Sequence, residues 1–289
     1  MTDAAAVRDA LAASVDHTDW RIVGPLTGGR QSGAWLVEGP GGDRAVVKLA
    51  TSPDWAERLS TAARSVARVR AAGYPTPAWS AVGSTPAGVG FVIQEFRHGR
   101  PTEVVDERVA VALLDVIASE AGLDPEPARC WSDFVVEQVG AGLDRLVDEA
   151  RPDPGLLAAC LSLAASAPLD PRRWPRTDMV HGDLRPANVL FLGDAVSGVV
   201  DIEAVGSGTR AFDHATLLTH QAISPGAVRM VVDAGVDAAG VDVFRACCAF
   251  AFLDLARFSV QAGGGADHRR TALARELTSR AVAVEQLTR

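Results

Sequence analysis

Lysine is almost absent from this sequence. The chain has 28 basic residues, and Lys48 is the single lysine among them; all the others are arginines. A chain that uses arginine everywhere else has kept a compact, strongly hydrated ammonium group at one position. Lys48 is therefore a candidate for a contact that an arginine does not replace.

Positive charge is also in short supply, because the formal net charge is −8 at pH 7. Binding to nucleic acid depends largely on basic residues that neutralise phosphates, so this composition argues against a nucleic-acid partner. The acids are unevenly distributed: residues 102–150 hold twelve acids and three arginines, a net charge of −9. Such a segment is either a pair of solvated helices or the source of a field that attracts a cationic substrate.

Long apolar runs and cysteine motifs are missing as well. The longest apolar stretch, Ala246 to Leu253, is too short to span a bilayer. The first residues lack the basic start and the apolar core of a signal peptide. The four cysteines have no metal-binding spacing and lie in apolar helical contexts, so we expect reduced core residues in a cytoplasmic protein without a membrane partner. These cysteines are Cys130, Cys160, Cys247 and Cys248.

What is present fits a soluble globular chain. Its 289 residues are 48% apolar and 22% charged, which suits one large domain or two modest lobes. The first third combines short β-like runs with one helix, which begins near Pro53 and ends near Gly73. The predicted strands are Trp20–Gly24, Ala34–Glu38, Ala45–Leu49, Trp79–Val82 and Val89–Phe96.

After "RHGRPT" the apolar spacing becomes helical. The pattern predicts a short N-terminal helix over residues 3–14, and in the later part helices over 103–121, 132–150, 154–167 and from about 210 onward. A small β insert interrupts the later helices. The chain therefore reads as an α+β protein with a β-rich front part and a mostly helical remainder.

One stretch, "MVHGDLRPANVLF" (residues 179–191), places polar groups between two apolar runs. It reads as strand, tight loop, strand, with the polar groups at the turn. Loops held by rigid strands are where catalytic groups tend to lie. The polar residues of this turn are His181, Asp183, Arg185 and Asn188.

A metal site is predicted next to this turn. Asn188 and Asp201 lie thirteen residues apart and bracket a hairpin whose turn is "GDAVSG". A hairpin brings its ends together, so both side chains are expected beside Asp183. Two oxygen ligands near a third carboxylate suit Mg²⁺, which takes few protein ligands together with substrate phosphates. An aspartate, an asparagine five residues on and a later metal-binding aspartate also form the pattern of protein kinases.

"HGDLRPANVL" followed by "GVVDIE" resembles the aminoglycoside phosphotransferase family and its small-molecule kinase relatives. The resemblance extends over nearly the whole chain, including "AVVKLA" around Lys48, the hinge from "VIQEF" to "HGRPT", and "AFDHATLL". It implies a bilobal protein-kinase-like fold with a β-rich N-lobe over 1–96 and a mostly helical C-lobe over 97–289. It also implies an Mg²⁺-dependent phosphotransferase that uses ATP or GTP and a small-molecule alcohol, as a monomer or a dimer.

The resemblance assigns a role to each matched position of the turn. Asp183 would orient the acceptor hydroxyl and serve as the candidate base. His181 would brace the loop by hydrogen bonding and not react, and Arg185 belongs to the same catalytic group. Asn188 and Asp201 would hold Mg²⁺ on the nucleotide phosphates.

Other matched positions would bind the nucleotide or support the loop. Lys48 would neutralise the α- and β-phosphates, and Asp213 would anchor the loop backbone from the following helix. The glycine-rich "TGGRQSGAW" offers Arg30 and Ser32 as phosphate contacts. The hinge suggests that adenine meets the backbone near Gln94 and Phe96.

Two positions depart from the pattern. The helix after Lys48 should carry a glutamate that pairs with the lysine, near the place of Ala62. Glu57 is the only glutamate in that helix and is therefore the candidate partner. Glu203, two residues after Asp201, is a further candidate on the substrate side, either as an outer metal ligand or only as a loop carboxylate.

The acceptor is left open among several classes. The acidic segment favours a cationic antibiotic, such as an aminoglycoside or a basic peptide, with resistance as the role. A metabolic kinase for choline, a sugar or homoserine is the main alternative, followed by a macrolide kinase and a nucleotide-binding pseudokinase. Asp254, in the apolar "CCAFAFLDLARF", is a candidate acceptor contact, although an ion pair with Arg257 explains it more simply. A protein kinase is excluded because no room is left for a long activation segment after Asp201.

Overall fold

The computed structural model describes residues 4–26, 33–50, 52–261 and 267–289. The chain divides into two compact units. Residues 1–99 and 197–204 form the first unit, and residues 100–196 and 205–289 form the second. The sequence placed a boundary after residue 96, and it contained no sign that residues 197–204 belong with the front part of the chain.

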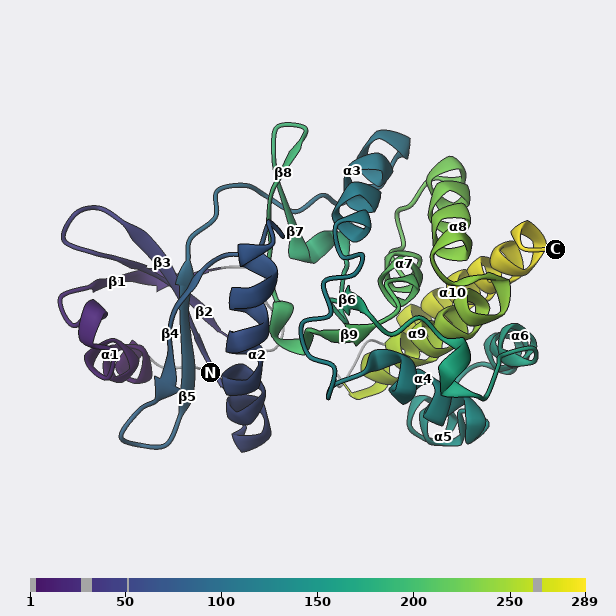
Figure 1. Ribbon diagram of the computed structural model, residues 1–289, viewed down its shortest axis with the longest axis horizontal. Helices are drawn as coiled ribbons and strands as arrows, with labels where there is room; N and C mark the ends of the chain where they lie inside the picture. Colours follow the sequence, from purple (N-terminus) through teal and green to yellow (C-terminus); the bar gives the residue numbers. More distant parts are fainter. Residues whose placement is uncertain (1–3, 27–32, 51, 262–266) are drawn as a thin grey trace. The chain divides into compact units, whose positions relative to one another are not determined.

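The first unit is built on a five-stranded antiparallel sheet in the order β1-β2-β3-β5-β4 (Figure 1). The predicted strands lie within about two residues of the observed ones at each end, because alternating apolar residues mark a half-buried strand reliably. The strands are β1 (Arg21–Pro25), β2 (Ala34–Glu38), β3 (Arg44–Leu49), β4 (Trp79–Ser84) and β5 (Gly90–Glu95).

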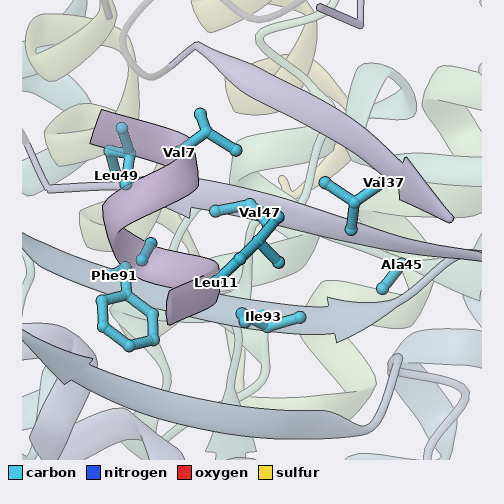
Figure 2. Close-up of a cluster of buried hydrophobic side chains, with 9 residues drawn as sticks. Val7, Leu11, Val37, Ala45, Val47, Leu49, Phe91 and Ile93 are labelled. Atoms are coloured by element: carbon cyan, nitrogen blue, oxygen red, sulfur yellow. The ribbon is translucent and has the colours of Figure 1, made fainter. Parts of the chain in front are cut away.

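Helix α1 (Ala4–Ala12) covers one face of this sheet (Figure 2). Val7 and Leu11 of the helix pack on alternate residues of the central strands, since successive side chains of a strand point to opposite faces. A short 3-10 segment, η1 (Val15–His17), follows the helix. The strand residues of this core are Val37, Ala45, Val47, Leu49, Phe91 and Ile93.

Helix α2 (Pro53–Ala71) packs against β4 and β5 and against the short segment η4 (Ile202–Ala204). The helix begins at Pro53 as expected, and Gly73 adopts a φ of +98° after its end. In addition, Ser52 accepts a hydrogen bond from the N–H of Trp55, a cap that was not predicted. Lys48 stands between two β3 residues that face α1, so its side chain points to the α2 side of the sheet.

The second unit is mostly helical, with α9 (Val241–Gln261) at its centre (Figure 1). Helices α4 to α8 and α10 all pack against it, and its middle is buried all round, as expected for an apolar central helix. The other helices are α3 (Glu107–Ala118), α4 (Trp131–Gly140), α5 (Asp144–Ala150), α6 (Pro154–Ala164), η2 (Pro171–Arg173), α7 (Ala211–Leu217), α8 (Pro225–Ala239) and α10 (Asp267–Leu287).

The helix expected over residues 132–150 is in fact two helices. Gly142 and Leu143 have φ values of +70° and +62°, in the left-handed region that ends a helix. Leu143 is only 1% exposed, so burial of its side chain offsets the conformational cost of about 1–2 kcal/mol. The prediction of one continuous helix was wrong because this apolar contact is not visible in the helical spacing.

The β insert contains more structure than the sequence indicated. Strand β6 pairs antiparallel with β9, a strand that was not predicted, and β7 pairs with β8. The expected strand, loop and strand over residues 179–191 are present. The elements are β6 (Asp178–Val180), η3 (Pro186–Asn188), β7 (Val189–Leu192), β8 (Ala195–Val199) and β9 (Gly206–Gly208).

The cysteines are free thiols, and three of them are buried, as expected. Burial raises the pKa of the Cys160 thiol to about 12, which leaves it unreactive. Cys130 differs, because it is only half-buried and precedes the first turn of α4. In the part of the chain that is described, no helix is both long and apolar enough to cross a membrane.

The close packing of α2 against the sheet can be tested at Gly90. A Cβ there would lie 2.6 Å from the Cβ and 3.0 Å from the Cα of Ala56, which belongs to α2. We expect Gly90→Ala to destabilise the fold by about 1–3 kcal/mol, the usual cost of overpacking. Urea unfolding measures this, and Gly24→Ala in β1 is the matched control, since a Cβ at that position would have no atom within 4 Å. Equal effects of the two substitutions would contradict this close approach.

Candidate functional site

Residues 181–188, here called the polar loop, are anchored by hydrogen bonds to Asp213 of α7. The carboxylate accepts the backbone N–H of His181 at 2.6 Å through Oδ2 and the N–H of Gly182 at 3.0 Å through Oδ1. Gly182 has a φ of +85°, which a residue with a side chain adopts only with strain. The anchoring contact expected of Asp213 is therefore present, and it fixes the start of the loop.

Asp183 is held on three sides within the polar loop. Asn188 Nδ2 donates to the Asp183 carbonyl at 2.8 Å and to its Oδ2 at 3.2 Å. Arg185 Nε lies 2.6 Å from Oδ1, and the Asp183 N–H donates to His181 Nδ1 at 3.3 Å. The Asp183 side chain is still 42% exposed, so a solute can reach a carboxylate whose direction is fixed.

The same contacts orient two neighbours. His181 Nδ1 accepts the N–H of Asp183, so the ring braces the loop by hydrogen bonding. Asn188 uses its amide nitrogen for Asp183, so its amide oxygen is directed away from that carboxylate. An oxygen of this kind is a suitable ligand for a hard cation such as Mg²⁺.

Lys48 lies in the first unit and forms ion pairs with Asp201 and with Glu203, the latter at 2.6 Å. Lys48 and Glu203 are buried, with side chains 7% and 11% exposed, whereas Asp201 is 48% exposed. Burial alone would lower the pKa of Lys48. The charges of Glu203 and Asp201 outweigh that effect and raise the pKa above its ordinary value, so the ammonium stays charged.

Asp201 has a φ of +59°, which is unusual for a residue other than glycine. Such a conformation costs on the order of 1–3 kcal/mol and persists only where the surroundings enforce it. Here it lies between β8 and η4 and directs a half-exposed carboxylate to Lys48. Strain of this kind is concentrated at functional positions.

The expected pairing of Lys48 with Glu57 was wrong. Glu57 is exposed on α2, while Ala62 on the same helix is 1% exposed and faces the sheet. Glu203 supplies the acid that α2 lacks, from a segment that follows the polar loop in the sequence. Its closeness to Asp201 was visible in the sequence, but its lysine partner was not. Neither role considered for Glu203 there, an outer metal ligand or a loop carboxylate, described this contact.

The nucleotide contacts expected in the first unit are only partly described. Arg30 and Ser32 lie outside the described residues. Gln94 is buried in β5 between Val46 of β3 and Trp79 of β4. The N–H of Phe96 already donates to the Arg44 carbonyl at 3.2 Å, so it is satisfied within the sheet. An adenine contact near Gln94 and Phe96 stays a prediction.

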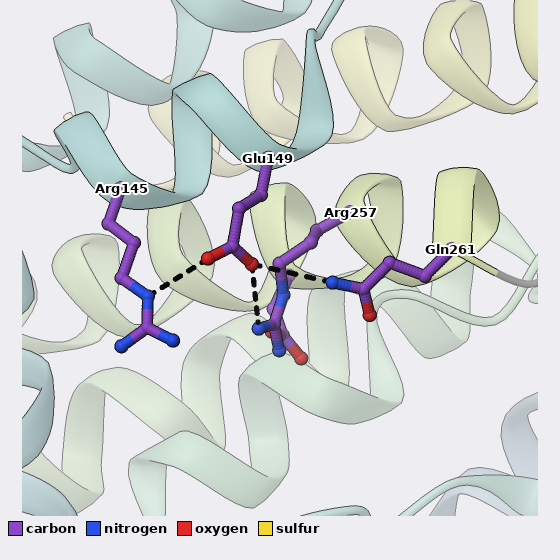
Figure 3. Close-up of polar contacts among 5 residues, drawn as sticks. Arg145, Glu149, Arg257 and Gln261 are labelled. Carbon is purple, nitrogen blue, oxygen red and sulfur yellow. Dashed lines mark hydrogen bonds and ion pairs between the residues drawn. The ribbon is translucent and has the colours of Figure 1, made fainter.

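Asp254 has the simpler of its two explanations, an ion pair with Arg257. Arg257 also lies 3.2 Å from Glu149, which Arg145 approaches at 2.9 Å and Gln261 at 3.4 Å (Figure 3). Two arginines face two carboxylates, so this cluster is balanced in charge. An acceptor that bound Asp254 would have to compete with Arg257.

A second acid beside the loop anchor was missed by the sequence analysis. Glu120, just after α3, is fully buried and lies near enough to Asp213 to affect the pKa of that group. Burial raises the pKa of Asp213 to about 7, although the N–H groups of His181 and Gly182 and the Glu120 side chain act in the opposite direction. A sequence signal existed, because an acid at the end of a helix opposes the helix dipole.

The two proposed metal ligands belong to different units, Asn188 to the second and Asp201 to the first. Each offers an oxygen donor of the type that Mg²⁺ prefers. Joint binding of one ion by both stays a prediction.

Comparison with known proteins shows the family and the fold of this chain. A family model described as the phosphotransferase enzyme family matches residues 23–250. Homoserine kinase of Methylocella silvestris is 27% identical over 144 residues, which cover 49% of this chain and 43% of that protein. Homoserine kinase of Beijerinckia indica is 29% identical over 147 residues, 48% and 44% of the two chains. The match thus spans less than half the length of these curated relatives.

Solved structures share the fold at low identity. Aminoglycoside phosphotransferase APH(4)-Ia is 18% identical with a TM-score of 0.67, over 99% of this chain and 100% of that one. A thermostable mutant of it has been solved with ADP and hygromycin B. The GDP complex of aminoglycoside 2'-phosphotransferase-IIIa is 16% identical with a TM-score of 0.68, over 93% of this chain and 96% of that one. Macrolide 2'-phosphotransferase MphH of Brachybacterium faecium is 20% identical with a TM-score of 0.59, over 94% of this chain and 97% of that one.

The protein-kinase-like fold expected from the sequence is therefore confirmed, with its five-stranded antiparallel sheet followed by a mostly helical part. Because the family model covers most of its length, this chain belongs to the phosphotransferase enzyme family, whose resemblance the polar loop first indicated.

Proposed function

We propose that this small-molecule phosphotransferase transfers the γ-phosphoryl group of ATP or GTP to a hydroxyl group of its acceptor, with Mg²⁺ bound to the nucleotide. The observation that carries the proposal is the half-exposed Asp183 carboxylate. It is fixed by Asn188 and Arg185 on a loop whose backbone is anchored by Asp213. A carboxylate aimed in this way is what an acceptor hydroxyl needs as its base.

In the proposed reaction, Asp183 accepts a hydrogen bond from the acceptor hydroxyl and receives its proton. The acceptor oxygen forms the new bond to the γ-phosphorus, and the bond from that phosphorus to the bridging oxygen of the nucleoside diphosphate breaks. Phosphoryl transfer depends mainly on positioning and charge neutralisation. Holding the two reactants in line supplies roughly 7–11 kcal/mol of the barrier reduction.

The metal would be held by the amide oxygen of Asn188 and the carboxylate of Asp201. When bound, Mg²⁺ neutralises charge on the phosphate oxygens. Lys48 neutralises the α- and β-phosphates, and Glu203 keeps its ammonium group charged and in place within the sheet. The nucleotides in the solved relatives, ADP and GDP, support a nucleoside triphosphate as the co-substrate.

For the acceptor, the first candidate is a cationic antibiotic, which would make the protein a resistance enzyme. The net charge of −8 and the acidic segment over 102–150 support it. The structure reduces the weight of that support, because several of these acids already have local partners. Asp106 caps α3, Asp133 pairs with Arg176, and Glu149 binds two arginines.

The second candidate is an amino alcohol of the homoserine type. The curated relatives with matching sequence are homoserine kinases, although each match covers about half of this chain. Such an acceptor carries one ammonium and one carboxylate and does not require a strongly negative surface. The charge-balanced pairs of the second unit fit a zwitterion at least as well as a polycation.

A panel of acceptors tests the function directly. Release of ADP or GDP would be measured with aminoglycosides, basic peptide antibiotics, macrolides, choline, sugars and homoserine. We expect turnover with one class, and Asp183→Asn should lower kcat about 10²–10⁴-fold, the contribution of a positioned base, with the KM for nucleotide little changed. Asp194→Asn is the matched control, since this exposed acid lies at the β7–β8 turn and binds Arg108. Near-normal turnover by Asp183→Asn would refute the role of this residue.

The corrected partner of Lys48 gives another test. Glu203→Gln removes a charged hydrogen-bond partner from a buried ammonium, and we expect a loss of about 1.5–3 kcal/mol in the free energy of unfolding. Glu57→Gln on the exposed face of α2 should change it by less than about 0.5 kcal/mol. Urea unfolding with each variant measures both values.

The difference in the free energy of unfolding between Glu203→Gln and Glu57→Gln should be independent of pH between 6 and 8. Because the pKa of Lys48 is raised in the folded state, its stabilising contribution is fully present below its unfolded pKa of about 10.4 and is lost only at higher pH. An equal loss from the two substitutions would mean that Glu203 is not the working partner of Lys48.

A further inference from the structure

A short strand pair leads both into the polar loop and into its anchor. β6 and β9 pair over three residues each, from Asp178 opposite Gly208 to Val180 opposite Gly206. The chain continues from β6 into the polar loop and from β9 into α7, which carries Asp213 (Figure 1). The position of the loop relative to its anchor therefore depends on the register of this strand pair.

The strand pair by itself specifies its register weakly. β9 has the sequence Gly-Ser-Gly, so two of its three residues have no side chain that could pack against a neighbour. Pairing of glycine-rich strands is prone to slip. A slip by one residue would move the loop by about 3.3 Å, which breaks the hydrogen bonds from the N–H groups of His181 and Gly182 to Asp213.

Asp178, at the start of β6, connects three segments at one end of the strand pair. Its Oδ2 lies 2.9 Å from Nη1 of Arg210 and accepts the backbone N–H of the same residue at 3.4 Å. Its Oδ1 accepts the N–H of Gly122, from the segment that follows α3, at 3.0 Å. The carboxylate thus binds β6 to the residue that precedes α7 and to a third part of the unit.

A second link joins the same two segments further along the chain. His181 lies three residues after Asp178, Asp213 lies three residues after Arg210, and the N–H of His181 donates to Asp213 at 2.6 Å. His214 also fixes the backbone at this point, because its Nδ1 lies 3.0 Å from the carbonyl oxygen of Arg210, which can only accept. The strand and the first turn of α7 are therefore joined at two points.

The ion pair between Asp178 and Arg210 is largely buried, with side chains 10% and 26% exposed. Its neighbours in the strand, Met179 and Val180, are fully buried, so an apolar residue would also suit this position. Because desolvation offsets most of the attraction, a buried ion pair adds little stability compared with apolar residues of similar volume. The best-attested use of such a pair is to select one register among alternatives.

We propose that Asp178 and Arg210 are positioning residues for the reaction. Their ion pair fixes the register of β6 against β9 and the start of α7, which places the Asp213 carboxylate on the N–H groups of the polar loop. The loop then presents Asp183 to the acceptor. The effect on catalysis rests on the proposed function, whereas the effect on the polar loop does not.

Hydrogen exchange of the polar loop tests the proposal without any acceptor. Exchange of peptides covering residues 179–190 would be measured by mass spectrometry at pH 7, with α6 and α10 as reference helices of the same unit. We expect Arg210→Gln and Asp178→Asn to speed exchange at the loop about tenfold or more, because the loop loses its register while the helical core stays intact. Exchange in the two reference helices should change little.

Two further variants separate positioning from a general loss of stability. Arg210→Lys keeps a positive charge beside Asp178, so its loop exchange should lie closer to that of the wild type than the exchange of Arg210→Gln does. Arg176→Gln is the matched control, since this arginine lies two residues before Asp178 and binds Asp133 of α4. Its loop exchange should follow the wild type.

The proposal is overturned if Arg210→Gln leaves the loop as protected as in the wild type, or if Arg176→Gln has an equal effect. Equal acceleration in the loop and in the reference helices also overturns it, because the contact would then be only structural. Asp178→Asn combined with Arg210→Gln should cost no more loop protection than the more harmful single change, since both remove one contact. Additive effects would contradict this. If Asp178→Asn does not fold, the comparison of Arg210→Gln with Arg210→Lys decides.

Once an acceptor is known, turnover should follow the same order. Arg210→Gln should lower kcat about tenfold or more, because a small misplacement of the base is costly, and Arg210→Lys should recover part of the loss. The KM for nucleotide should change less than kcat, since Lys48 stays in place. A change confined to that KM would overturn the proposal. Inactivity of the wild type on every acceptor would reject the proposed function alone, because the exchange result does not depend on turnover.

Discussion

The conformation of the polar loop in the second unit depends on a buried carboxylate that accepts two backbone N–H groups. Asp213 has no exposed surface, and an ionised carboxylate in such a place is costly unless hydrogen bonds replace water. The N–H groups of His181 and Gly182 supply these bonds only in the observed turn, with Gly182 at a φ of +85°. The conformation of the polar loop is therefore fixed by what Asp213 requires, and the exposed Asp183 takes its direction from that turn.

The first unit depends in the same way on a buried positive charge, the ammonium group of Lys48. Lys48 is buried on the α2 side of the sheet, and an ammonium group there needs acidic partners. They come from Asp201 and Glu203, the latter 155 residues further along the chain. This requirement explains why residues 197–204 belong to the first unit although the sequence on both sides of them belongs to the second. In each unit a buried charge is satisfied by a segment distant in sequence, and a candidate site residue lies beside it.

The sequence predicted the features that depend on residues near each other along the chain, and it did not predict those that depend on distant residues. The strands around Lys48, the ends of α2 at Pro53 and Gly73 and the polar loop all depend on neighbours along the chain, and their residues were recognisable. The break at Leu143 depends on the burial of one side chain, and the helical spacing on both sides concealed it. The partners of Lys48 were missed for the same reason, because an acid in a sequence carries no sign of the group that it will meet. Glu57 was favoured by its place in the expected helix, but burial and distance selected Glu203.

The same limit applies to the acidic segment over 102–150. Its net charge of −9 is a property of composition, whereas the field at a binding site depends on which charges are compensated. In the fold, Asp106 satisfies the N-terminus of α3, and Asp133 binds Arg176. Glu149 and Asp254 share Arg257. A count of acids therefore overstates the attraction of this unit for a polycation. Recognition of the acceptor depends more on hydrogen bonds and shape around Asp183, where a single fixed carboxylate meets the solute, than on the total charge of the helices.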